Sequence, residues 1–269
     1  MNNGNHRFKL ANTIRGRGPT VILVHGLGSS RQDWNLLTTR LVSAGYKTCS
    51  VDLLGHGDSP KPNTSDYYTI QSIYKAFETW IDDLEESGPY HMVGHSLGGY
   101  LSLNLALRRP DKVRAMTVID PMYSLRQIHP ILRFLSTSIN LGTKLLPKIP
   151  EGWIDAAMSL DPVTSSQFSK QARRRIAIDI KRASPQVLHI TRNVPDLTPE
   201  LAAISQPCQV IWGDLDITLM ADSFPRLVDS LPQASAEVIR GTRHQPHIGL
   251  PEILNPLVLE FVNQQSRII

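Results

Sequence analysis

The pentapeptide at residues 94–98, Gly-His-Ser-Leu-Gly, places one serine hydroxyl between two glycines at a spacing that suits nucleophilic chemistry. An apolar run over residues 90–93 precedes it, and a helix-like pattern follows directly. A strand that turns into a helix over one residue strains that residue's backbone and lifts its side chain clear of the sheet. Gly94 and Gly98 suit this turn, because strand and helix pass too closely to leave room for a Cβ. We therefore predict that Ser96 is a nucleophile.

A simpler interpretation of the same serine competes with this one. Serine is common at helix N-caps, where its hydroxyl accepts a backbone N–H and does no chemistry. The catalytic interpretation therefore depends on whether the fold brings an acid and a base to Ser96.

Strands and helices are expected to alternate through most of the chain. Apolar runs without polar interruption are typical of strands that are buried on both faces. The expected strands are Phe8–Arg15, Thr20–Val24, Lys47–Leu53, the run from Tyr90, Val113–Asp120, Pro207–Gly213 and Ala236–Ile239. Helical patterns separate them, among them one capped by Thr69 and a closing one at Pro251–Gln265. This alternation predicts an α/β fold with a mostly parallel, doubly wound sheet.

The alternation stops after Pro121. The following segment has helical patterning and no convincing strand, until the strand–helix pattern resumes at Pro207. We therefore predict an α/β core formed by residues 1–120 and 200–269, interrupted by a helical insertion at residues 121–199.

Residues that could act in chemistry follow several of the expected strands. In open α/β sheets, ligands bind beyond the carboxyl ends of the strands, so these residues share one edge. The segments concerned are His25–Gly28, Asp52–Asp58, Ser96–Leu97, Asp120, Asp214–Asp216 and Arg240–His247. A nucleophile, candidate acids and candidate bases are therefore expected together.

Taken together, these segments resemble the α/β-hydrolase family over nearly the whole chain. The similar motifs are His25-Gly26 (oxyanion segment), residues 55–59 (G-H-G-x-S turn), residues 94–99 (nucleophile turn), residues 213–216 (G-x-x-D) and the segment around His244. The order Ser, Asp, His is also the family's order. The resemblance implies a serine esterase-like or lipase-like hydrolase, with a cap domain at the insertion.

The resemblance also implies a catalytic triad. The Ser96 hydroxyl is a poor nucleophile at its free pKa, so a neutral imidazole, assigned to His244, takes its proton. A buried carboxylate, assigned to Asp216, holds the imidazole tautomer and stabilises its protonated form. The alternatives are His247 for the base and Asp120 or Asp214 for the acid.

The remaining site residues are expected around this triad. Developing charge on the substrate oxygen needs preorganised donors, and the backbone N–H groups of Leu27 and Leu97 are assigned to that oxyanion hole. The insertion supplies apolar side chains for a pocket. The residues expected at the substrate site are His25, Gly26, His95 and Trp153.

Composition and charge bound the functional classes. The chain has 269 residues, of which 41% are hydrophobic, and no apolar run is long enough to span a bilayer. The first seven residues are polar and are not followed by a signal-peptide core. Cys49 and Cys208 lie in or beside apolar runs and are expected to be free, buried thiols, so a cytoplasmic protein is expected.

No metal or other cofactor is expected. No His, Cys or carboxylate cluster has metal-ligand spacing, and residues 94–99 lack the lysine of a phosphate loop. Residues 121–192 hold eleven Lys or Arg against four Asp or Glu. We interpret this excess as solvated helix faces or a mild attraction for anionic substrates, and expect a small-molecule substrate rather than nucleic acid. No feature of the sequence points to an oligomeric state.

The sequence leaves three functions open, because function depends on the pocket rather than on the fold. The first is a serine hydrolase that cleaves a carboxylic ester or lactone through an acyl-enzyme. The second uses the same triad for carbon–carbon bond hydrolysis, amide cleavage or perhydrolysis. The third is a small-molecule receptor with vestigial hydrolysis.

Overall fold

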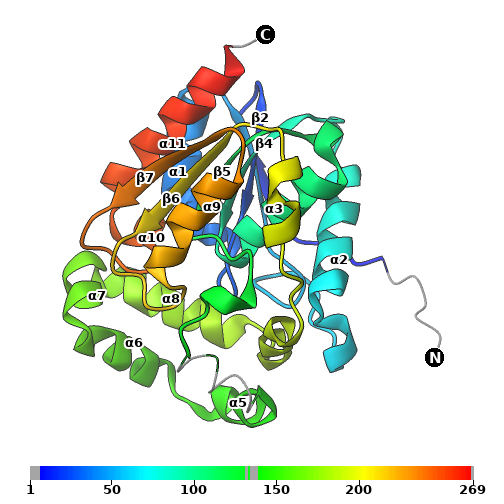
Figure 1. Cartoon of the computed structure of the whole chain (residues 1–269). Coiled ribbons are helices and arrows are strands. Elements are labelled where there is room, and N and C mark those ends of the chain that lie inside the picture. The colour runs from blue at the N-terminus through cyan, green and yellow to red at the C-terminus, as the bar shows by residue number, and fades with distance from the viewer. Residues whose placement is uncertain (1–6, 131–132, 134–138, 268–269) are drawn as a thin grey trace.

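A seven-stranded sheet forms the centre of the computed structural model, which describes residues 7–130, 133 and 139–267 (Figure 1). The order across the sheet is β1-β3-β2-β4-β5-β6-β7. Only β1 pairs antiparallel, and the other neighbouring pairs are parallel. The strands are β1 Asn12–Arg15, β2 Thr20–Val24, β3 Lys47–Val51, β4 Tyr90–His95, β5 Val113–Ile119, β6 Cys208–Gly213 and β7 Ala234–Ile239. The predicted α/β class with a mostly parallel sheet is confirmed.

The central strands are apolar throughout because helices cover both faces of the sheet. Ile22 and Leu23 are adjacent in β2 and both fully buried, yet they belong to two different core clusters. The first cluster includes side chains of α2 (Ile70–Asp82), α3 (Leu97–Arg108) and α9 (Phe224–Ser230). The second includes side chains of α1 (Asn35–Ser43) and α11 (Pro251–Ser266). Figure 1 shows these two groups of helices on opposite sides of the sheet. The sheet is therefore doubly wound.

Local signals place several element ends where the sequence predicts them. The hydroxyl of Thr69 accepts the backbone N–H of Ser72 at 3.1 Å and caps α2. The opening strand is shorter than predicted, because β1 begins at Asn12 where its pairing with β3 begins. The closing helix α11 extends to Ser266, one residue beyond the prediction.

Between β5 and β6, the described elements are helices and 3₁₀ turns. The α-helices are α5 Ile139–Leu145, α6 Glu151–Leu160, α7 Pro162–Gln167 and α8 Lys170–Arg182. Figure 1 shows them gathered on one side of the molecule, beyond the sheet. The segment meets the carboxyl end of β3, where the Ser184 N–H donates to the Gly55 carbonyl at 2.8 Å. The division into a core and a cap at residues 121–199 stays a prediction.

Both cysteines are free and buried, as predicted. Cys49 lies in β3 and Cys208 begins β6. None of the helices in the described part of the chain combines the length and the apolar character needed to cross a bilayer. Residues 1–6, on which the expectation about a signal peptide depends, lie outside the described residues.

Candidate active site

Ser96 forms the whole turn between β4 and α3. Its backbone angles, φ 50° and ψ −110°, lie outside both strand and helix conformations. A Cβ on Gly94 would lie 2.3 Å from the Gly98 carbonyl oxygen, and one on Gly98 would lie 2.1 Å from that of Val24. Such approaches are too close for any side chain, so both glycines are needed for the turn. The strained residue is the serine itself.

His244 brings an imidazole to Ser96 from the loop that follows β7. Its Nε2 lies 3.0 Å from the Ser96 Oγ. The other ring nitrogen, Nδ1, lies 2.7 Å from Oδ2 of Asp216. Because Nδ1 faces a carboxylate, it carries the ring proton, and Nε2 is left to accept the serine proton.

Asp216 is held by its own loop after β6. Its side chain is fully buried. Its Oδ1 accepts the backbone N–H groups of Thr218 at 2.7 Å and Leu219 at 3.1 Å. With the His244 Nδ1–H on Oδ2, the carboxylate accepts three hydrogen bonds, which compensate for its removal from water.

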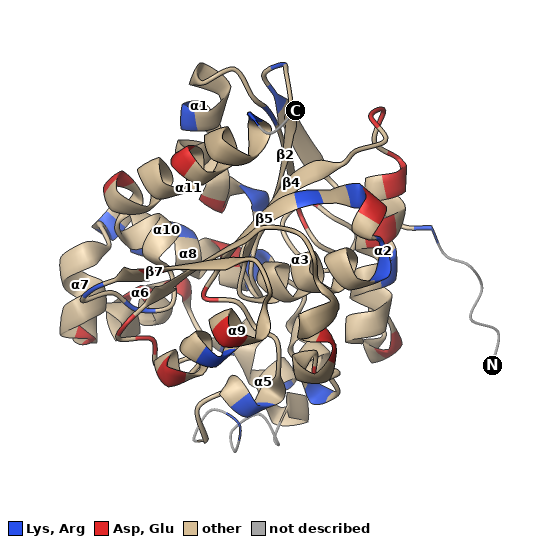
Figure 2. Cartoon of the chain, turned by 45° about the horizontal axis from the view of Figure 1, so that its top comes forward, with Lys and Arg blue, Asp and Glu red and all other residues tan. Residues whose placement is uncertain are grey.

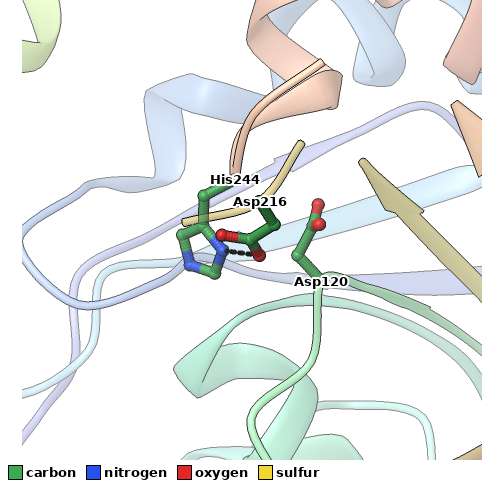
Figure 3. A group of neighbouring side chains, drawn as sticks. All are labelled: Asp120, Asp216 and His244. Carbon is green, nitrogen blue, oxygen red and sulfur yellow. Dashed lines mark hydrogen bonds and ion pairs between the residues drawn. The ribbon is translucent and has the colours of Figure 1, made fainter. Parts of the chain in front are cut away.

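The other two candidate acids lie at the same edge, but neither has a hydrogen bond to the His244 ring in the described part of the chain. Asp214 is exposed and accepts the Gly241 N–H at 2.6 Å, so it shapes its turn. Asp120 is fully buried and accepts the Gly213 N–H at 2.9 Å. Figure 3 shows Asp216 between Asp120 and the ring of His244. Although Asp120, Asp216 and His244 lie close enough to hold a metal ion, two of them already hydrogen-bond to each other.

The two N–H groups assigned to the oxyanion hole are free to donate. Neither the Leu27 N–H nor the Leu97 N–H has an acceptor among the residues that the structure describes. Leu97 is the first residue of α3, where backbone N–H groups have no partner within the helix. Gly26 lets the other loop approach, because a Cβ there would lie 3.3 Å from the Ser96 Cβ. Their role as oxyanion donors stays a prediction.

The side chains expected at the substrate site differ in what surrounds them. His25 is fully buried, and its Nδ1 and Nε2 bond to the Gly26 carbonyl (2.7 Å) and the Leu53 N–H (3.0 Å). Both ring nitrogens therefore brace loop backbone. Trp153 lies on α6 with 71% of its surface exposed. Their contacts with a substrate, like those of Gly26 and His95, stay predictions.

The alternative base, His247, is buried against Trp34 and Asp33. Its ring stacks on Trp34 with centroids 4.9 Å apart, and its Nε2 lies 3.9 Å from the Asp33 carboxylate. Burial lowers the pKa of His247, so the ring is neutral. It has no hydrogen bond to Ser96 in the described part of the chain.

A polar network that no local sequence pattern predicts joins α8 to residues 30–33, which follow β2. Arg175 donates to the buried carboxylate of Asp33 at 2.8 Å, and Ser30 donates to Asp179 at 3.0 Å. Charged residues elsewhere lie mainly on helices and loops around the sheet (Figure 2). Arg175 is one of the eleven Lys or Arg of residues 121–192, whose excess the sequence predicts to be solvated helix faces or a mild attraction for anionic substrates. Arg175 instead joins the segment between β5 and β6 to the rest of the fold.

Comparison with known proteins identifies the family of the fold. The family model described as alpha/beta hydrolase fold matches residues 19–249. A pimeloyl-[acyl-carrier protein] methyl ester esterase of Aeromonas hydrophila is 25% identical, over 92% of this chain and 96% of that protein. Lipase 3 of Moraxella sp. is 24% identical, over 86% of this chain and 73% of that protein. A solved structure of a thermophilic esterase from Thermogutta terrifontis superposes with a TM-score of 0.82 at 22% identity, covering 96% of this chain and 94% of that one.

Proposed function

The chain belongs to the alpha/beta hydrolase fold family, and we propose that it is a serine hydrolase that cleaves carboxylic esters through an acyl-enzyme on Ser96. The observation that carries the proposal is the hydrogen-bonded line from Ser96 through His244 to Asp216. A line of this kind is the arrangement that turns a serine hydroxyl into a nucleophile.

In the proposed mechanism, His244 acts first as a base and then as an acid. Its Nε2 takes the Ser96 proton while Oγ attacks the ester carbonyl carbon. The N–H groups of Leu27 and Leu97 donate to the carbonyl oxygen as it becomes an oxyanion. Asp216 stabilises the imidazolium, which then gives its proton to the departing alkoxide. Water, deprotonated by the same imidazole, then attacks the acyl carbon. As the bond to Ser96 Oγ breaks, the imidazolium returns the proton to Oγ, and the acid and free Ser96 are released.

The choice of an ester substrate rests on the relatives. Two of them are named a methyl ester esterase and a lipase, and each matches most of this chain. We further infer that residues 121–199 form a cap over the site. Phe168 of this segment is buried, and a Cβ on Gly249, near His247, would lie 3.1 Å from its ring. Apolar side chains from the segment would suit an apolar acyl or alcohol group.

Labelling with a fluorophosphonate tests the proposal most directly. The probe reacts with an activated serine, so we expect wild-type protein to be labelled at Ser96. Ser96→Ala removes the nucleophile and His244→Ala removes the base, so both variants should lose labelling. His247→Ala is the matched control and should keep most of it.

A substrate panel completes the test. We expect turnover of p-nitrophenyl acetate or butyrate with an initial burst that Ser96→Ala abolishes. No labelling of Ser96, together with no turnover of any short-chain ester, would reject the proposal. Turnover of a diketone, an amide or peroxide in preference to esters would support the same residues acting in a different reaction. Labelling lost with His247→Ala alone would reassign the base.

A further inference from the structure

Asp120 presents a buried carboxyl oxygen without a donor among the residues that the structure describes. The residue follows β5, and its Oδ1 accepts the Gly213 N–H at 2.9 Å. Its Oδ2 is buried and has no hydrogen-bond partner among the described residues. An unpaired charged oxygen in such a place is costly, so Oδ2 is expected to carry a proton or to share one.

The group beside this oxygen is another carboxyl group. Oxygen atoms of Asp120 and Asp216 and a ring nitrogen of His244 all lie within 4.8 Å of one another. Figure 3 shows Asp120 on the side of Asp216 away from the His244 ring. Two carboxyl groups this close in a buried site do not both ionise, so one of them holds a proton at neutral pH.

The number of donors decides which of the two is charged. Asp216 accepts three hydrogen bonds, from His244 Nδ1 and from the N–H groups of Thr218 and Leu219. Asp120 accepts one, from Gly213. Burial, and then the charge of Asp216, raise the pKa of Asp120 well above its ordinary value. The charge therefore stays on Asp216 and the proton on Asp120.

We propose that Asp120 is a positioning residue for the triad, whose carboxyl group, protonated on Oδ2, donates a hydrogen bond to the Asp216 carboxylate. The inference rests on the proposed function, because it gives Asp216 its role through His244. The hydrogen bond would hold Asp216 from the side opposite the imidazole. Arg243 is also near Asp216. The pKa of Arg243 is raised chiefly by its hydrogen bond to Asp161 and further by the charge of Asp216.

The backbone of Asp120 provides matched variants. Its φ of +40° lies in the left-handed region, which Asn and Gly tolerate better than other residues. Asp120→Asn keeps an acceptor for Gly213 and offers an N–H donor to Asp216. Asp120→Gly removes the side chain without straining the backbone. Because both variants tolerate this backbone conformation, a difference between them reports the hydrogen bond to Asp216 rather than strain in the fold.

We expect Asp120→Asn to keep kcat/KM within about twofold of wild type and to leave the acidic limb of its pH profile unmoved, since a neutral donor replaces a neutral donor. Asp120→Gly should lower kcat/KM by roughly tenfold to a hundredfold, because Asp216 and His244 lose alignment. Wild-type kcat/KM in the Gly variant would overturn the inference. A decrease of about one unit or more in the pKa of the acidic limb of the Asp120→Asn pH profile would also overturn it. Such a decrease would mean that the substitution had removed a negative charge beside His244.

A second measurement does not depend on activity. Carboxyl ¹³C NMR of protein labelled at aspartate should show a protonated acid at pH 7 that Asp120→Asn removes. If no such resonance exists, Asp120 is ionised and the inference fails, even where a fluorophosphonate labels Ser96. If Ser96 is not labelled but the protonated acid is present, the proposed function fails and the positioning role fails with it.

Discussion

The Nε2 N–H of His95 donates a 2.7 Å hydrogen bond to the backbone carbonyl of His244. His95 directly precedes Ser96, so the bond ties the neighbour of the nucleophile to the main chain that carries the imidazole. Burial lowers the pKa of His95 well below its ordinary value, so the ring is neutral and has one N–H to give. The geometry gives His95 a means of positioning His244.

Replacing His95 with leucine should therefore misplace the base. We expect His95→Leu to lower kcat/KM by roughly tenfold to a hundredfold, because small displacements of reacting groups are costly. His95→Gln offers an amide N–H near the same position and should lose less. Steady-state kinetics on a p-nitrophenyl ester measure both variants. Equal activities in the two would show that the hydrogen bond does not position His244.

Gly26→Ala tests the close approach of the loop that carries Leu27. A Cβ there would lie 2.7 Å from His95 Nδ1, so either the His95 ring or the loop that carries the Leu27 N–H must shift. We expect kcat to fall on the order of a hundredfold, as when an oxyanion donor is lost. Gly152→Ala in α6 is the control, because nothing lies within 4 Å of a Cβ there. A Gly26→Ala variant with wild-type kcat would contradict the requirement for close packing between this loop and His95.

The position of Ser96 could be predicted from sequence because its signals are local. Two glycines, an apolar strand and a helix pattern all lie within a few residues of it. The same holds for the strands, whose apolar runs follow from burial on both faces. The location of His244 and Asp216 at one edge of the sheet could also be predicted, since the carboxyl ends of parallel strands lie at the same edge.

Side-chain contacts between distant segments could not be predicted in the same way. Asp120 and Asp216 both follow strands, and only the path of the loop through Thr218 and Leu219 turns one of them toward His244. Arg175 and Asp33 are 142 residues apart, so no local pattern pairs them. Such pairs depend on how the helices dock, which periodicity does not specify.

Arg175→Met should loosen the attachment of α8. The Arg175 guanidinium is the cation on Asp33, whose carboxylate is buried, so removing it leaves a poorly compensated charge. We expect a loss of about 1–3 kcal/mol in the free energy of unfolding, measured by urea denaturation. Arg174→Met is the control, since Arg174 is exposed and has no ion pair among the described residues. Equal losses in both variants would mean that the Asp33 pair adds nothing to stability.

Two buried titratable groups, His91 and Asp120, make the free energy of unfolding depend on pH in opposite directions. Burial lowers the pKa of His91 to about 3, so between that value and 6.5 the unfolded chain binds a proton that the folded chain does not. Stability through His91 therefore falls as the pH falls across this window. Asp120 acts the other way. Its pKa is raised, so the folded chain keeps a proton that the unfolded chain has lost above pH 3.8.

Two variants should accordingly change the slope of unfolding free energy against pH in opposite directions. Between pH 5 and 6, each group contributes about 1.4 kcal/mol per pH unit, which is the slope for one proton. His91→Gln should lower the slope by that amount, and Asp120→Asn should raise it. Urea denaturation at pH 5.0, 5.5 and 6.0 measures all three proteins, and each variant is the control for the other. An unchanged slope in His91→Gln would show that His91 is protonated in the folded chain, and an unchanged slope in Asp120→Asn would show that Asp120 is ionised there.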